Sequence, residues 1–222
     1  MSQQDWTLVL DSLWPLTLGA VRGTIPLAVV SFAAGLVLAL VLALMRLSRR
    51  PWLSAIARAY ISVVRGTPLL VQLFVIFYGL PSIGLVIDPW PSAVVAFSIN
   101  VGGYAAEVIR AAILSVPKGQ WEAAYMIGMS HPLALRRIIL PQAARVSVPP
   151  LSNTFISLVK DTSLASLILV TELFRRAQEV AAFSQEFMLL YLEAALVYWL
   201  ICLVLSTAQG SLEKRLDRYV AH

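Results

Sequence analysis

From Thr24 to Met45 the chain carries no charged side chain. About 20 consecutive, mostly apolar residues are enough for one helix to cross the hydrocarbon core of a bilayer, so this stretch alone predicts a membrane span. The composition agrees, because 59% of the 222 residues are hydrophobic and only 13% are charged. Soluble domains carry about 25% charged residues. The sequence therefore predicts an all-α membrane protein.

Further apolar stretches bring the expected number of spans to five, and four or six stay open because charges interrupt several of them. The expected spans are residues 24–45, 54–80, 91–116, 147–172 and 188–209. The sequence contains no low-complexity linker and no internal repeat. We therefore treat the spans as parts of one domain.

The basic residues predict the orientation of the chain, because loops rich in lysine and arginine stay on the cytoplasmic side. They gather after the first span, after the third span and near the C-terminus, at Arg46, Arg49, Arg50, Lys118, Arg136, Arg137, Arg145, Lys214 and Arg215. We expect the N-terminus outside and the C-terminus in the cytoplasm. This topology accounts for much of the net charge of +5, so no nucleic-acid partner is expected.

Residues 1–20 lack the basic start of a signal peptide and are amphipathic. The apolar residues that would share one face of a helix are Trp6, Leu10, Leu13 and Trp14. We expect an interfacial helix on membrane lipid here, at the outer surface, followed by a membrane domain over residues 21–215. The single cysteine, Cys202, excludes an intrachain disulfide, and no metal site is expected.

Ionisable residues within the expected spans are costly in lipid and normally face a protein interior or a water-filled cavity. They are Arg65, Glu107, Arg110, Lys160 and Asp161. From the helical rise, Asn100 lies roughly 14 Å and Lys160 roughly 20 Å from the end at which its span begins. The Arg65–Pro68 sequence interrupts the second span near that depth, and Leu69 and Gln72 follow it. Polar and irregular features at one level predict a substrate cavity near the midplane.

The partners of these charged residues stay open. Glu107 and Arg110 lie three residues apart on a helix, so they either form a structural pair or contact substrate. Lys160 and Asp161 point about 100° apart and do not satisfy each other. We expect Lys160 to bind a substrate carboxylate rather than Glu107, and Asp161 to be structural rather than to bind an ammonium group. Thr162 offers a hydroxyl at the same depth.

A polar, basic loop over residues 117–145 separates the third span from the fourth. The sequence predicts two short helices, one from Trp121 to Met129 and a second that runs to about Leu140, where Pro141 ends or kinks it. Small residues make the first helix thin on one side. Three interpretations stay open: the loop lies on anionic lipid, it packs on its own subunit, or it fits a groove on a partner.

The spacing within this loop is specific. Glu122-Ala123-Ala124 is followed by Gly128, then nine residues, then Ile138-x-Leu140-Pro141, which resembles the EAA motif of ATP-binding-cassette (ABC) importer permeases. The whole of residues 15–215 is similar to the polar-amino-acid branch of the type I permeases, which includes histidine, glutamine and, most similar, cystine permeases. The stretches that carry this resemblance are RGTPLLVQLFVIFYGLP (65–81), YAAEVIRAAILSVPKGQWEAA (104–124), LPQAARVSVPPLSNTFISLVKDTSL (140–164) and ELFRRAQ (172–178).

The resemblance implies a multi-pass permease subunit of the type I ABC importer fold, with five transmembrane helices, in a bacterial inner membrane. It implies three partners: a second permease subunit, an ABC ATPase dimer and an external solute-binding protein. We expect the second permease subunit to be another copy of this chain, and a heterodimer stays open. The substrate would be a polar amino acid, L-cystine first. The chain lacks the G-x-x-x-x-G-K-[ST] loop, so it is not itself an enzyme, and ATP and Mg would belong to the partner ATPase.

The resemblance also assigns residues to two sites. The EAA helix would be the coupling helix that docks on the ATPase, through Glu122, Ala123, Ala124 and Gly128. The family's amino-acid site matches Leu69, Asn100 and Lys160, with Gln72 and Thr162 nearby.

Two other classes of protein stay open. An ion- or proton-coupled secondary amino-acid transporter would also bury charges, but such folds usually show internal inverted repeats, which this sequence lacks. A scaffold or channel would keep the midplane charges for structure alone.

Overall fold

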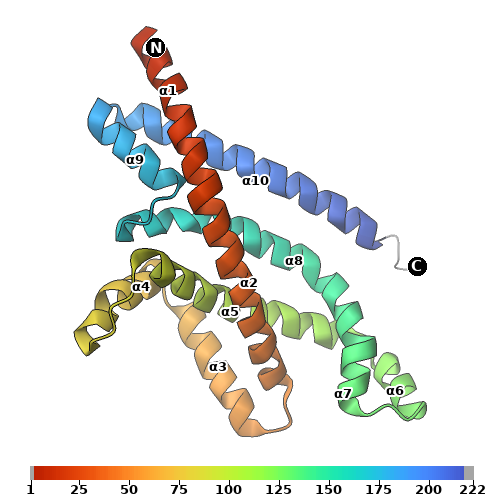
Figure 1. Cartoon of the computed structure of the whole chain (residues 1–222). Helices are drawn as coiled ribbons and strands as arrows, with labels where there is room; N and C mark the ends of the chain where they lie inside the picture. Colours follow the sequence, from red (N-terminus) through yellow and green to blue (C-terminus); the bar gives the residue numbers. More distant parts are fainter. Residues whose placement is uncertain (1–2, 218–222) are drawn as a thin grey trace.

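The computed structural model describes residues 3–217, in which helices are the only regular elements, and α5 (Pro89–Ser115) lies at their centre (Figure 1). It contacts α2, α3, α4 and α8. The other elements are α1 (Gln3–Gly19), η1 (Ala20–Thr24), α2 (Ile25–Leu47), α3 (Pro51–Gly66), α4 (Leu69–Phe74), η2 (Val75–Gly79), η3 (Leu80–Ile83), α6 (Lys118–Met126), α7 (His131–Ala134), η4 (Leu135–Ile139), α8 (Leu140–Asp161), η5 (Thr162–Ile168), α9 (Leu173–Ser184) and α10 (Phe187–Asp217).

The tightest helix pair is α2 with α5. The backbone of Gly35 in α2 lies so close to Val101 in α5 that a Cβ added at Gly35 would stand 2.6 Å from the Cβ of Val101. Gly102 approaches Leu38 from the opposite helix in the same way, at 2.7 Å. Because lipid provides no hydrophobic drive for helices to associate, small residues that permit such close packing hold membrane helices together. Phe97, fully buried, fills the adjoining core.

The expected spans agree with the observed helices in number but not in form. Within the described residues, three helices are long and apolar enough to cross a membrane, and two bent helix pairs raise the number to five. The spans expected at 91–116 and 188–209 correspond to α5 and α10. The expected break at residues 65–68 is confirmed, since α3 and the helix that begins at Leu69 meet at 105°.

The fourth expected span, residues 147–172, is shorter than predicted. Its helix, α8, ends at Asp161, and a 3₁₀ segment, η5, carries the chain on to Ile168. The outer connection expected after this span is itself helical, because α9 follows at 49°. Glu172 caps α9 by accepting hydrogen bonds from the backbone N–H groups of Phe174 and Arg175, as N-cap residues do.

The predicted boundary at residue 20 is not a break in the structure. Residues 1 and 2 lie outside the described part of the chain, but α1, η1 and α2 form one helical run, of which Trp6–Leu47 spans 42 residues. That length is about 63 Å, roughly twice the thickness of the hydrocarbon core. Leu16 and Ala20 are buried against α9 and α10. The N-terminal helix therefore packs on its own chain rather than standing apart from the membrane domain.

Three π turns in the described chain each precede a proline by two residues. They are η1 before Pro26, η2 before Pro81 and η4 before Pro141. A proline removes one hydrogen bond and its ring presses on the carbonyl four residues earlier. A wider turn at that point accommodates the ring and lets the helix continue. Of the two outcomes predicted at Pro141, an end or a kink, the end is excluded, because the helix runs on into α8 (Figure 1).

We expect Gly35→Ala to destabilise the fold by about 1–3 kcal/mol, because the added methyl group would overlap Val101 in a packed interface. Thermal unfolding of the purified protein, followed by fluorescence-detected size exclusion, measures this as a lower midpoint. The matched control is Gly210→Ala in α10, where an added Cβ meets nothing within 4 Å. Equal midpoints for the two variants would contradict the packing account.

Candidate functional site

The break between α3 and α4 opens the backbone at residues 66–68. Thr67 is extended, with φ −120° and ψ 144°, and Pro68 follows at φ −63° and ψ 139°. A residue before proline is disfavoured in the helical region, so α3 stops at Gly66 and a new helix begins at Leu69. Unpaired backbone groups at such a break must be satisfied within the protein.

The Gln72 side chain satisfies two backbone carbonyls at this break. Its Nε2 donates to the carbonyl of Val64 at 2.8 Å, and also to the carbonyl and hydroxyl of Thr67 at 3.2 and 2.9 Å. Its Oε1 accepts a hydrogen bond of 3.2 Å from Nδ2 of Asn100. Gln72 thus joins the broken span to α5 and holds the amide of Asn100 in place, which is a positioning role.

A cavity of about 510 Å³ adjoins this clip. Leu69 and Asn100 line it, as expected for two of the predicted substrate residues. The other polar residues of its wall are Thr67, Tyr104, Asn153, Thr154, Ser157 and Asp161. Ligand pockets of this size have mostly apolar walls and a few convergent polar groups, which describes this one.

Lys160 and Asp161, at the end of α8, face two different hollows. Asp161 lines the cavity with Leu69 and Asn100, whereas Lys160 lines a second groove of about 570 Å³, formed by aromatic residues of α9 and α10 such as Tyr191 and Trp199. Among the side chains of residues 6–215 neither forms an ion pair, so Lys160 does not pair with Glu107 as the sequence left open.

The structure separates Thr162 from the cavity. Its side chain is fully buried, and its hydroxyl donates to the carbonyl of Val159 at 2.7 Å. Such local bonds are the usual state of a hydroxyl in a helix. Thr162, predicted to lie near the substrate, therefore does not line this cavity.

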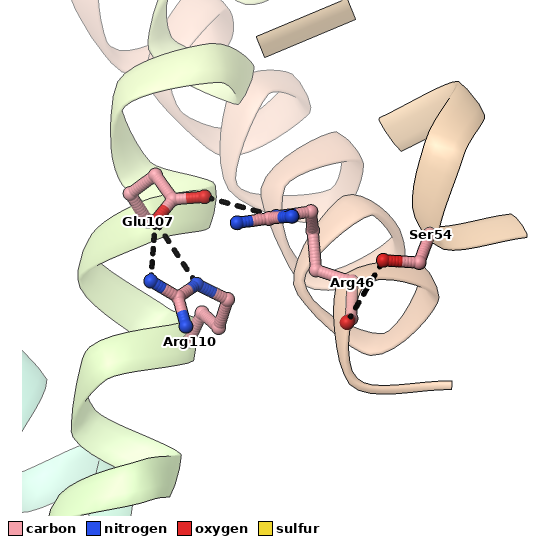
Figure 2. Close-up of polar contacts among 4 residues, drawn as sticks. All are labelled: Arg46, Ser54, Glu107 and Arg110. Carbon is pink, nitrogen blue, oxygen red and sulfur yellow. Dashed lines mark hydrogen bonds and ion pairs between the residues drawn. The ribbon is translucent and has the colours of Figure 1, made fainter. Parts of the chain in front are cut away.

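Glu107 is the centre of an ion-pair cluster that ties α5 to α2 (Figure 2). Its carboxylate accepts from Nε of Arg46 at 3.2 Å and from NH2 of Arg110 at 2.8 Å. The Arg46 carbonyl in turn accepts a hydrogen bond of 3.4 Å from the hydroxyl of Ser54 in α3. The three charged side chains are 19–29% exposed. Of the two alternatives for Glu107 and Arg110, this geometry favours a structural pair.

The loop over residues 117–145 contains the two helices that the sequence predicts, α6 and α7. Gly128 joins them at φ +79°, a left-handed conformation that other residues rarely adopt. The ring of Trp121 stacks on that of His131 with centroids 4.9 Å apart, and the Tyr125 hydroxyl lies 2.7 Å from Nδ1 of His131. These contacts hold α6 against the start of α7.

The predicted docking residues differ in their exposure. Glu122, Ala123 and Gly128 are exposed, but Ala124 is 3% exposed and packs within its own chain. The thin side of α6 thus makes an internal contact at Ala124 and leaves Ala123 exposed. Next to the exposed residues stand Met126 and Ile127, which are 87% and 73% exposed. Sequence patterning did not single them out, because an apolar pair at a helix end reads as ordinary packing.

No group of three His, Cys, Asp or Glu side chains within residues 6–215 is placed to hold a metal ion. The site is therefore built from backbone openings, amides and two charged groups on the membrane domain, together with an exposed loop below it.

Comparison with known proteins assigns this arrangement to a family. The model of the family described as "Binding-protein-dependent transport system inner membrane component" matches residues 9–218. The chain belongs to this family. It is 59% identical to the L-cystine transport system permease protein TcyB of Bacillus subtilis (strain 168), over 97% of this chain and 93% of that one. It is 38% identical to the glutamine transport system permease protein GlnP of Escherichia coli (strain K12), over 96% and 98%.

Solved structures of this family agree. A structure titled as an amino acid ABC transporter with histidines matches with a TM-score of 0.89 at 33% identity, over 97% of this chain and 100% of that one. The MetNI methionine ABC transporter shares the fold, with a TM-score of 0.72 at 18% identity, over 97% and 99%. The fold is that of a type I ABC importer permease, as the sequence predicts. As a member of this family, the chain is a transport subunit of the inner membrane. The comparisons do not support an ion- or proton-coupled secondary transporter.

We expect Glu107→Gln to destabilise the protein by about 1–3 kcal/mol, because it leaves two partly buried arginines without their shared carboxylate. The matched control is Glu179→Gln, which removes a carboxylate that also pairs with two arginines, Arg175 and Arg176, but on its own more exposed helix. That change should cost less than about 1 kcal/mol. Thermal unfolding midpoints compare the two, and an equal loss in both would show that the cluster does not join α2 to α5.

Proposed function

We propose that this permease subunit moves L-cystine into the cell. The most similar relatives described above include a cystine permease of 59% identity that is matched over nearly its whole length. In this proposal two copies of the chain form the pathway, and an ABC ATPase dimer, which carries the ATP and Mg, docks on the loop at residues 117–145. An external solute-binding protein delivers the substrate. The loop and the C-terminus lie in the cytoplasm and the N-terminus outside.

The observation that carries the proposal is one uninterrupted helical run. From His131 in the loop to Asp161 at the cavity, α7, η4 and α8 continue into each other. At 1.5 Å per residue this run is about 45 Å long. A partner that moves the loop therefore moves the residues at the far end, since a helix transmits displacement along its axis. The stack of Trp121 on His131 makes α6 move with the same run.

The chemistry of the two ends of this run suits such coupling. At the loop end Ala123, Met126 and Ile127 form an exposed, largely apolar knob with Glu122 beside it. A short helix with apolar anchors is the type of element that fits a groove on another protein. We propose that Glu122, Ala123 and Gly128 dock on the ATPase together with Met126 and Ile127, and that Ala124 keeps the loop folded.

At the cavity end the charges match a zwitterion. Each half of cystine carries one ammonium and one carboxylate group. Asp161, which faces the cavity and has no ion pair among the described residues, would bind the ammonium group. Lys160, exposed on the adjacent groove, would bind a carboxylate. Asn100 and Leu69 would contact the remaining polar and apolar atoms, with Gln72 holding Asn100 in place. This assigns Asp161 to substrate rather than to structure.

In the transport cycle, closure of the ATPase dimer would draw the two loops together and shift the α7–α8 runs, which opens the cavity to the outside. The binding protein would then release cystine to Asn100, Lys160 and Asp161. Hydrolysis of ATP would separate the loops and return the cavity to the inward-facing state. The chain itself contributes binding groups and mechanical connection, whereas the energy comes from the partner.

We expect Asp161→Asn and Lys160→Gln each to lower cystine uptake about tenfold or more, because each removes a charge-assisted hydrogen bond to substrate. Radiolabelled uptake is measured at subsaturating cystine with the binding protein present and with equal amounts of permease in the membrane. Lys214→Gln, which removes an exposed lysine near the end of α10, is the control and should leave uptake unchanged. Wild-type uptake by both site variants would overturn the proposed pocket.

We expect Gly128→Ala to weaken retention of the ATPase, because a side chain at φ +79° costs about 1–2 kcal/mol and distorts the link between α6 and α7. Co-purification of the ATPase with tagged permease should fall about tenfold, and uptake should fall with it. Gly119→Ala, at an open helical position of the same loop, makes the same chemical change without strain. If both variants retain the ATPase as the wild type does, the loop is not the docking site.

A further inference from the structure

A cavity distinct from the substrate site lies where the ends of α2 and α5 meet the loop. Its volume is about 760 Å³. Apolar side chains of the two span ends form one wall, namely Leu44, Leu47, Ile113 and Leu114. The loop forms the other wall, in which Trp121 and Leu135 take part. None of these residues enters the transport site or the exposed knob described above.

Positive charge lies at the mouth of this cavity. Arg49, from the connection after α2, and Lys118, from the first turn of α6, both line it and are exposed. Neither forms an ion pair with another residue of the described chain, and no aspartate or glutamate belongs to the lining. Two cations therefore face the opening without an internal counter-charge.

An apolar wall next to two cations is suited to bind an amphiphilic anion. The apolar wall belongs to the last turns of two membrane-spanning helices, which places it at the edge of the hydrocarbon core, and the cations stand just beyond those turns. Basic pockets between helix ends on the cytoplasmic side attract the headgroups of anionic lipids. Tryptophan, here Trp121, is enriched at this depth because its ring has both an apolar body and a polar N–H.

We propose that this cavity binds an anionic phospholipid of the cytoplasmic leaflet, with its phosphate at Arg49 and Lys118 and the start of an acyl chain against Leu44 and Leu114. The proposal rests on the cytoplasmic orientation given under the proposed function. A free phosphate would use the two cations and leave the apolar wall without a partner, so a lipid fits the whole lining better.

The bound lipid would also brace the docking loop. Trp121 and His131, whose rings stack on each other, both line the cavity. A headgroup beneath them would therefore contact the joint that holds α6 to α7. In this way the composition of the leaflet would influence how firmly the loop is presented to the ATPase.

The test is lipid retention by the full chain purified with its ATPase, measured by native mass spectrometry during titration with dioleoylphosphatidylglycerol or dioleoylphosphatidylcholine. We expect phosphatidylglycerol to bind in preference to phosphatidylcholine. The double variant Arg49→Gln/Lys118→Gln should lose at least tenfold in apparent affinity for phosphatidylglycerol. The matched control, Arg50→Gln/Arg136→Gln, removes two exposed charges of the same region that do not line the cavity.

Three results would overturn the proposal: equal binding of the two lipids, an equal loss in the two double variants, or displacement of phosphatidylglycerol by millimolar inorganic phosphate, which would assign the cations to a free anion. Lipid retention is read without transport. If cystine uptake alone fails, the proposed substrate is refuted and the lipid site is unaffected. If the preference for phosphatidylglycerol alone is absent, the transport proposal is unaffected.

Discussion

Lipid offers no hydrogen bonds to a peptide backbone, and the architecture of this permease follows from that constraint. Long helices satisfy it without help, as α5 and α10 do. A break in a span does not, so the break at Thr67 and Pro68 lies against α5, where Gln72 fills the open carbonyls and holds Asn100. The tight contact of α2 with α5 provides the firm surface against which these openings are arranged. The cavity that Leu69 and Asn100 line adjoins a helix that is interrupted where protein, not lipid, surrounds it.

The same constraint explains why the loop and the cavity are connected. Prolines in a membrane helix would normally end it or leave a carbonyl unpaired, but π turns carry the helix past Pro26 and Pro141. In the second case the result is a single run from the docking loop to Asp161. Charge pairs also join the long helices, as Glu107 does by pairing with Arg46 of α2 and Arg110 of α5. In the proposed function, coupling and substrate binding thus take place at the two ends of this one helical run.

The features that depend on local sequence could be predicted, whereas contacts between residues far apart in the chain could not. The break at Pro68 and the meeting of Leu69 with Asn100 follow from residue type and depth along a helix. The pairing of Arg46 with Glu107 could not be predicted, because it joins residues 61 positions apart whose contact depends on how two spans pack. The 100° between Lys160 and Asp161 predicts that they point apart, but the hollow that each lines depends on which helices pack beside α8. Likewise the burial of Ala124 depends on a neighbouring helix that residue type does not reveal.

The account makes the membrane chain a passive partner whose transport is powered by an ATPase docked on its loop. Uptake of radiolabelled cystine into proteoliposomes that contain the permease and its ATPase, with loaded binding protein outside and nucleotide inside, tests this most directly. The account predicts uptake with ATP in the lumen, none with ADP, and no change when the membrane potential is collapsed. Uptake that persists with ADP and follows an imposed potential would contradict it.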